Sequence, residues 1–234
     1  MTPSDRIILA LDVAGEAAAL AWVERVGRRV GLVKVGLELF VAAGPALVRK
    51  LRQRGIGVFL DLKLHDIPNT VAGAVRAAAR CDVQMLTVHA AGGAAMLAAA
   101  AAAAPPGLTL LGVTVLTSLD AAALQELNLP STAAERVVAW ARLCQRQGLG
   151  GIVCSAQEAA VVRQASGGGV KLIVPGIRPA GSTTGDQARV ATPADAIRAG
   201  ADYLVLGRAV TAAADPEAAL EAVTQEIASV AGGR

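Results

Sequence analysis

The chain is short of aromatic residues and of clustered charge, and both shortages argue against a nucleic-acid-binding protein. Phe, Trp and Tyr together make up only 2% of its 234 residues. That is too few for the aromatic platforms on which single-stranded nucleic acids stack. The formal net charge is only +3 and no run of like charge occurs, so no basic tail is present either. We therefore expect no nucleic-acid partner.

Cysteine is also scarce. The three cysteines, Cys81, Cys144 and Cys154, are odd in number and lack the short spacings of metal ligands, which argues against a disulfide framework or a zinc site. The first residues show no basic segment followed by an apolar one, so no signal peptide is predicted. We expect a reduced protein of the cytoplasm.

Charged residues are absent from one long stretch, residues 83–119, which is long enough to span a bilayer. This stretch is rich in alanine, contains His89 and is broken by Pro105-Pro106-Gly107. It is better explained as two buried strands flanking an alanine-rich helix. We therefore expect no membrane span.

What the chain does contain is a regular alternation of short apolar runs and helix-like segments. Alanine alone makes up roughly a fifth of the chain, which favours helices. The runs are rich in β-branched residues and lack polar alternation, as in parallel strands buried on both faces. We expect strands over residues 6–11, 32–35, 57–62, 85–88, 108–115, 151–154, 171–174 and 203–206. We expect helices over residues 16–30, 44–54, 69–79, 92–104, 132–147, 157–165, 193–199 and 216–230.

Eight strand–helix repeats with no linker between them predict an α/β protein with a single (β/α)8 TIM barrel over residues 1–234. A doubly wound open sheet is the alternative. It is weakened because no G-x-G-x-x-G motif follows the first strand.

Polar residues recur where the predicted strands end, which is where TIM barrels carry their active sites. They are Asp12, Lys34, Asp61, Lys63, His89, Thr117, Ser118 and Arg208, and Pro175 and Gly207 lie at the same strand ends. An ordered set across most strands predicts one site at the carboxyl end of the barrel.

The densest polar feature is residues 61–70, Asp-Leu-Lys-Leu-His-Asp-Ile-Pro-Asn-Thr. Asp61 and Lys63 are two residues apart, so on a strand they point to the same side. A surface ion pair, or a helix cap formed by Asp66 or Asn69, would be the simpler explanation. However, these charges interrupt an apolar strand, and Lys34 would come from the neighbouring one. Buried charges are costly unless they are paired, which favours a functional cluster.

These motifs resemble those of the orotidine 5′-phosphate decarboxylase family, in its bacterial form. The resemblance covers nearly the whole chain and is most specific in residues 61–70. It also includes Leu9-Ala10-Leu11-Asp12, Val33-Lys34-Val35-Gly36, Leu116-Thr117-Ser118, Val174-Pro175-Gly176-Ile177-Arg178-Pro179, Gly185-Asp186-Gln187 and Leu206-Gly207-Arg208.

The resemblance implies decarboxylation of orotidine 5′-phosphate to UMP and CO2, in pyrimidine biosynthesis, without a cofactor or a metal. It assigns Lys63 as the acid that protonates C6 and Asp61 as the carboxylate beside the departing CO2. Lys34 and Asp66 complete the charged array. Asp66, with Ile67 and Thr70, would come from the second subunit of a homodimer.

The resemblance also implies the contacts to the rest of the substrate. Asp12 and Lys34 match contacts to the ribose hydroxyls, and Thr117 and Ser118 match contacts to the pyrimidine. Pro175 belongs to the strand-end motif that lines the site. The phosphate end is matched by Arg178, Gln187, Gly207 and Arg208, with residues 179–187 as a loop that closes over it.

Two alternatives remain open. One is a Mg2+-dependent 3-keto-L-gulonate 6-phosphate decarboxylase or hexulose-phosphate synthase, since these enzymes share the D-x-K-x-x-D pattern. The resemblance to them places an acidic metal ligand at the position where this chain has Lys34, which argues against this alternative. A non-catalytic phosphate-binding barrel is the other, and the intact Lys63 argues against it. We expect His65 and His89 to be structural, and Gly167-Gly168-Gly169 to form a turn at the other end of the barrel.

Overall fold

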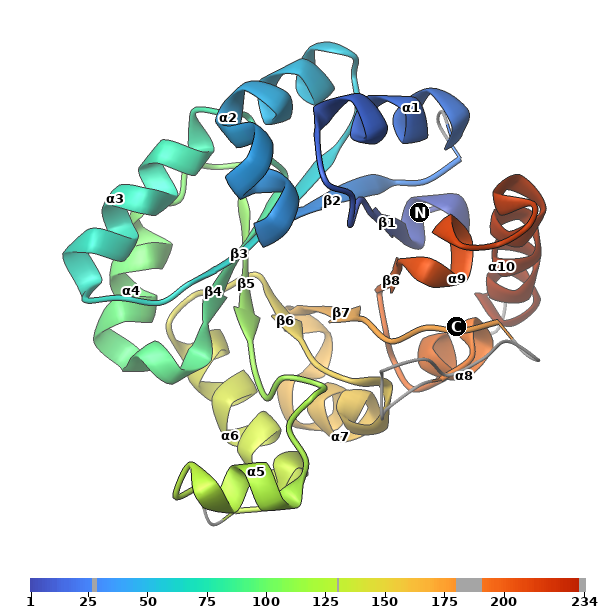
Figure 1. Ribbon diagram of the computed structural model, residues 1–234. Helices are drawn as coiled ribbons and strands as arrows, with labels where there is room; N and C mark the ends of the chain where they lie inside the picture. Colours follow the sequence, from blue (N-terminus) through green and yellow to red (C-terminus); the bar gives the residue numbers. More distant parts are fainter. Residues whose placement is uncertain (27–28, 130, 180–190, 232–234) are drawn as a thin grey trace.

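Eight parallel strands close into a barrel in the order of the sequence, so the predicted (β/α)8 fold is confirmed. The computed structural model describes residues 1–26, 29–129, 131–179 and 191–231. Figure 1 shows the strands at the centre and the helices around them. The strands are β1 (Ile7–Ala10), β2 (Leu32–Gly36), β3 (Val58–Leu64), β4 (Met85–His89), β5 (Thr109–Val113), β6 (Gly151–Val153), β7 (Lys171–Val174) and β8 (Tyr203–Leu206).

The longer helices run along the outside of the barrel. They are α1 (Glu16–Val26), α2 (Leu37–Gln53), α3 (Pro68–Ala79), α4 (Gly93–Ala103), α6 (Ala133–Arg146), α7 (Ala156–Ser166) and α10 (Pro216–Ala231). Shorter pieces are α5 (Ala121–Glu126), α8 (Pro193–Arg198) and α9 (Arg208–Thr211). Three 3-10 turns are η1 (Ser4–Arg6), η2 (Ala90–Gly92) and η3 (Gly167–Gly169). No helix within the described ranges is both long and apolar enough to cross a bilayer.

The apolar residues form two separate cores. A large one fills the space between strands and helices. A small one fills the barrel itself, and its buried members are Ile8, Ala10, Leu32, Phe59, Met85, Leu111, Ile173 and Val205. Because side chains alternate along a strand, the next inward residue toward the carboxyl end stands directly above this small core. The inner core is thus the floor on which the inward polar side chains of β2, β3 and β4 rest.

The helices differ from the sequence prediction at one place that matters for the site. Helix α2 begins at Leu37, directly after β2, rather than at residue 44. Gly44 breaks it with φ +64° and ψ −168°. Pro45 follows the break, where a proline suits the first turn of a helix. The predicted segment is therefore only the second part of α2. The short helices α5 and α9, which follow β5 and β8, were not predicted.

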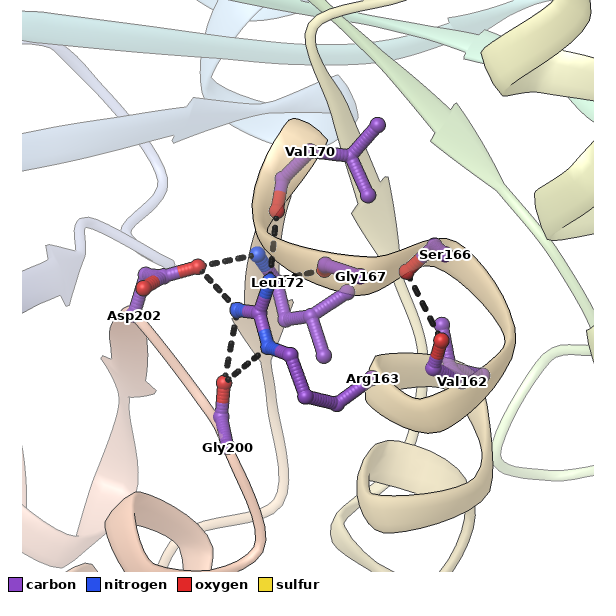
Figure 2. A network of polar contacts seen from close by, with 8 residues as sticks. All are labelled: Val162, Arg163, Ser166, Gly167, Val170, Leu172, Gly200 and Asp202. Carbon is purple, nitrogen blue, oxygen red and sulfur yellow. Dashed lines mark hydrogen bonds and ion pairs between the residues drawn. The ribbon is translucent and has the colours of Figure 1, made fainter.

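The end of the barrel opposite the strand carboxyl ends is held by Arg163 of α7 (Figure 2). Its guanidinium donates to the carbonyls of Gly167 and Val170, and to Gly200. Nη2 also donates to Asp202 Oδ2 at 2.5 Å, and that oxygen accepts the amide of Leu172 at 2.8 Å. One side chain thus joins α7, η3 and the entries to β7 and β8. The predicted turn at residues 167–169 lies here, away from the strand carboxyl ends.

We expect Arg163→Met to lower the free energy of unfolding by about 2–4 kcal/mol, because three carbonyls and Asp202 lose a partly buried charged donor. The matched control is Arg198→Met, which breaks an Arg–Asp pair whose side chains are 61% and 62% exposed. That change should cost less than about 1 kcal/mol. Urea unfolding followed by circular dichroism measures both. Equal losses in the two variants would contradict the importance of the Arg163 network.

Candidate active site

A cavity of about 240 Å3 opens at the carboxyl ends of the strands. Its wall includes many of the polar residues that the sequence singled out. They are Asp12, Lys34, Asp61, Lys63, Thr117, Arg178 and Arg208, and Pro175 and Gly207 of the same strand-end motifs also line the cavity. Apolar wall is supplied by side chains such as Phe59, Val113 and Val115. Residues from seven of the eight strand ends or the loops after them therefore converge on one hollow.

Four charged side chains of alternating sign form a row across one side of the cavity. Lys34 Nζ lies 3.2 Å from Asp12 Oδ1 and 3.7 Å from Asp61 Oδ2. Lys63 Nζ donates to Asp61 Oδ1 at 2.9 Å. Asp61 is therefore shared between two ammonium groups.

Burial falls from the middle of this row to its ends. The side chains of Lys34 and Asp61 are each 13% exposed, that of Lys63 is 33% exposed and that of Asp12 is 61% exposed. Desolvating a single charge is costly, and opposite neighbours offset the cost. The alternation of sign places each of these charges beside an opposite one, which offsets the cost of its desolvation.

Gly36 provides the room that Lys34 occupies. A Cβ atom on Gly36 would lie 3.1 Å from Lys34 Nζ and 3.6 Å from Asp12 Oδ1. Gly36 pairs with Asp61 across β2 and β3. The absence of a side chain at this register position lets the ammonium of Lys34 approach the Asp61 carboxylate.

The backbone of β3 departs from a regular strand at the site. Lys63 has φ +48°, a region that costs a non-glycine residue about 1–2 kcal/mol. The amide of Lys63 donates to Thr87 Oγ1 at 2.8 Å, and Thr87 Oγ1 donates to Asp61 Oδ1 at 3.0 Å. Thr87 was not among the residues predicted from the sequence. Its only signal was a hydroxyl residue at an inward position of an apolar strand.

Two arginines, Arg178 after β7 and Arg208 after β8, also line the cavity. Gly176, with φ +77°, turns the chain after β7. Ile177 then forms an isolated bridge with Ala191, in which the Arg178 amide donates to the Ala191 carbonyl at 3.0 Å. Gly207 and Arg208 stand where β8 passes into α9. The wall of the cavity thus contains both the alternating charged row and two arginines.

Some predicted residues do not line this cavity. Asp66, Ile67 and Thr70 follow β3 and are exposed, and Asp66 Oδ1 accepts the amide of Ile67. Ser118 is exposed beside Thr117. Gln187, and the predicted phosphate loop after Pro179, lie outside the described residues.

The two histidines pack against each other beside the charged row. Their ring centroids are 5.3 Å apart and nearly parallel, and Trp140 meets His89 edge-on at 6.0 Å. His89 Nδ1 accepts the amide of Ala91. Burial, and then the charges of His65 and Lys63, lower the pKa of His89 below its usual value. His89 is therefore neutral at pH 7 and adds no further cation beside Lys63.

Cys154 lines the cavity but is poorly suited to act as a nucleophile. Burial, reinforced by Glu158, raises the pKa of its thiol to about 12. The thiolate is the reactive form, so this sulfur stays protonated at neutral pH. Within the described part of the chain, no cluster of three His, Cys, Asp or Glu side chains is placed to hold a metal ion.

Fold and site together define a class: a TIM-barrel enzyme with a Lys–Asp–Lys array and two arginines in the wall of its cavity. Comparison with known proteins gives the family. Residues 5–223 match the model of the orotidine 5′-phosphate decarboxylase / HUMPS family. The chain belongs to this family.

Individual relatives agree with this assignment. The chain is 58% identical over 223 residues to an orotidine 5′-phosphate decarboxylase of Anaeromyxobacter sp. (strain K), covering 95% of this chain and 98% of the relative. It is 52% identical to the protein of that name from Moorella thermoacetica, covering 98% and 95% of the two chains. The crystal structure of orotidine 5′-phosphate decarboxylase from Lactobacillus acidophilus superposes with a TM-score of 0.84 at 37% identity, covering 94% of this chain and 98% of that one.

We expect Cys144 and Cys154 of the native protein to resist alkylation by iodoacetamide at pH 8, because burial raises the pKa of each thiol to about 12. Only about 10⁻⁴ of such a thiol is ionised at that pH. Peptide mass spectrometry measures modification, with the same protein in urea as the control that should react rapidly. Native Cys154 reacting as fast as a free thiol would contradict the expectation.

Proposed function

We propose that this protein is an orotidine 5′-phosphate decarboxylase, a carboxy-lyase that converts orotidine 5′-phosphate to UMP and CO2. The observation that carries the proposal is the position of Lys63. Its ammonium lies in the cavity wall, 2.9 Å from a carboxylate that is shared with Lys34. A proton donor and a fixed cation are thus combined in one side chain.

The chemistry of the substrate explains why such a side chain is needed. Loss of CO2 from C6 of the pyrimidine leaves an electron pair in an sp2 orbital that lies in the ring plane. This pair cannot delocalise into the π-system as that of an enolate does. The negative charge must be met by a preorganised cation, and Lys63 supplies both that charge and the proton that ends the reaction.

Asp61 fixes the direction of the Lys63 ammonium and lies where the substrate carboxylate would depart. Because Asp61 is already paired with two lysines, the array needs little reorganisation when charge moves from the carboxylate to C6. Lys34 pairs with Asp61 without competing for C6, since it approaches the other carboxylate oxygen.

The rest of the substrate would be held by the remaining predicted residues. Arg178, Gly207, Arg208 and Gln187 are assigned to the phosphate, for which guanidinium groups are well suited. Asp12 and Lys34 are assigned to the ribose hydroxyls, Thr117 and Ser118 to the pyrimidine, and Pro175 to the wall between them. Binding energy at the phosphate can be used to close the site and to orient C6 against Lys63.

The Mg2+-dependent branches of the family are not favoured. A basic side chain, Lys34, lies beside Asp61 at 3.7 Å, and an ammonium at this position would repel a divalent cation. We propose that the reaction needs neither a metal nor a cofactor. A silent phosphate-binding barrel is less consistent with the Lys34–Asp61–Lys63 row, because binding a phosphate does not require it.

We further propose that two copies of the chain form a homodimer with shared active sites, in which Asp66, Ile67 and Thr70 reach the cavity of the other subunit. Their exposure in a single chain supports this idea. So do the large apolar side chains of Leu37, Val41 and Ile67, which are 53%, 82% and 68% exposed and follow the carboxyl ends of β2 and β3. Apolar exposure of this kind is typical of association surfaces.

Three broader proposals complete this picture. Residues 1–234 form one decarboxylase domain, for which the family match over residues 5–223 is the support. The protein acts in pyrimidine biosynthesis in the cytoplasm. Its only other partner is its small-molecule substrate, with no role for nucleic acid or membrane.

Purified protein should decarboxylate orotidine 5′-phosphate in the presence of EDTA, as followed by the loss of substrate absorbance. Lys63→Ala should reduce turnover by at least roughly 10⁴-fold, because it removes both the proton donor and the cation. Circular dichroism should show an unchanged fold. An inactive wild-type protein would refute the proposed activity, and a near-wild-type rate for Lys63→Ala would remove Lys63 from its role.

Subunit mixing tests the shared site. Lys63→Ala and Asp66→Ala homodimers should each be nearly inactive. Refolding the two together should restore about a quarter of wild-type activity, because half of the dimers are mixed and each of these has one intact site. Each variant refolded alone is the control. Activity no greater than the sum of the two would count against residues shared between subunits.

A further inference from the structure

We propose that Thr87 is a positioning residue for the decarboxylation, through a hydroxyl that fixes the Lys63 backbone and the Asp61 carboxylate together. Thr87 lies in the middle of β4 and is fully buried. It does not line the cavity, so it would act through Asp61 and Lys63 rather than on the substrate. This inference rests on the proposed function.

The strand pairing leaves a gap that the Thr87 hydroxyl fills. Leu60 of β3 pairs with Leu86 of β4, but the next pair is Leu64 with Val88. Between these two pairs the chain moves four residues along β3 but only two along β4. Asp61, Leu62 and Lys63 therefore have no partner in the β3–β4 ladder. Thr87 Oγ1 accepts the Lys63 amide at 2.8 Å. A side-chain oxygen thus replaces the missing backbone acceptor.

The same hydroxyl also fixes the carboxylate. Thr87 Oγ1 donates to Asp61 Oδ1 at 3.0 Å, and Lys63 Nζ donates to that same oxygen at 2.9 Å. The three residues thus form a closed ring of hydrogen bonds. Thr87 contacts both the backbone amide of Lys63 and the Asp61 carboxylate that the Lys63 ammonium contacts. Both hydrogen bonds of the Thr87 hydroxyl are therefore made with the proposed catalytic pair, Asp61 and Lys63.

The surroundings of Thr87 explain why a threonine suits this position. Below Thr87 the barrel interior is apolar, with Met85 as the preceding inward residue of β4. A buried hydroxyl there is unfavourable unless it is fully hydrogen-bonded. The β-branched side chain has few χ1 rotamers, so its oxygen is held in one direction. It supports Lys63 in its left-handed conformation, φ +48°, which a strand would otherwise disfavour.

Thr87→Val keeps the shape of the side chain and removes both hydrogen bonds. We expect kcat to fall roughly 10- to 100-fold, the range set by losing a hydrogen bond to a charged group. The affinity for UMP should change by less than about threefold, because UMP is held through the phosphate, ribose and pyrimidine contacts that are assigned elsewhere. Thr87→Ser, which keeps the hydroxyl, should retain most of the wild-type kcat.

Thr114→Val is the matched control. Thr114 is equally buried, and its hydroxyl donates to the Val153 carbonyl at 2.8 Å, away from the charged row. It should lose stability as Thr87→Val does, yet keep the wild-type kcat. If Thr87→Val does not fold, Thr87→Ser and Thr87→Ala replace it, since these two variants differ only in the hydroxyl.

The outcomes separate the two hypotheses. Suppose that the wild-type protein is active. An undiminished kcat in Thr87→Val, or an equal loss of kcat in Thr114→Val, then overturns the role of Thr87 but not the proposed function. Equal rates for Thr87→Ser and Thr87→Ala do the same. A wild-type protein that leaves orotidine 5′-phosphate intact overturns the proposed function and, with it, this role. A selective loss of kcat in Thr87→Val, rescued in Thr87→Ser, supports it.

Discussion

The site depends on one electrostatic constraint: a carboxylate with 13% side-chain exposure, Asp61, must be neutralised on both sides. Lys63 meets one of its oxygens at 2.9 Å and Lys34 approaches the other at 3.7 Å. In a poorly solvated wall, removal of either lysine would leave net charge without compensation. The two ammonium groups are in turn held in place by the carboxylate between them. Neither lysine therefore has to be held by the substrate, and the array exists before the substrate arrives.

The local backbone follows from this constraint. Asp61 and Lys63 come from the same strand, and the Lys63 ammonium contacts the Asp61 carboxylate. At this point β3 leaves its regular pairing with β4 after Leu60, and Lys63 adopts φ +48°. Such strain persists only where the surroundings determine it. Here β4 does so through Thr87, and β2 contributes Gly36, whose missing side chain leaves space for Lys34. The residues Thr87 of β4 and Gly36 of β2 are thus suited to the charged side chains of β3.

Sequence patterns predicted the barrel and most of its charged row, because both depend on order along the chain. Continuous apolar runs define buried strands, and Asp61 and Lys63 stand out from one of them. The start of α2 could not be predicted in this way, since Gly44 and Pro45 look like a helix beginning although they lie at a break. Thr87 was missed for a different reason. Its importance comes from a register shift between β3 and β4, and single-chain periodicity contains no information about how two strands pair.

The barrel divides its polar interactions between its two ends in a way that suits a reaction of this kind. At the amino ends of β7 and β8, Arg163 satisfies backbone carbonyls and Asp202, and every contact joins one element to another. At the carboxyl ends, Asp61, Lys63 and Lys34 contact one another and face a cavity. Charges of the first kind contribute stability, whereas those of the second are held ready for a charge that a substrate brings. The apolar layer of Phe59, Met85 and Leu111 between them keeps the two networks apart. The polar mouth can therefore be organised around a reacting atom while the opposite end keeps the barrel closed.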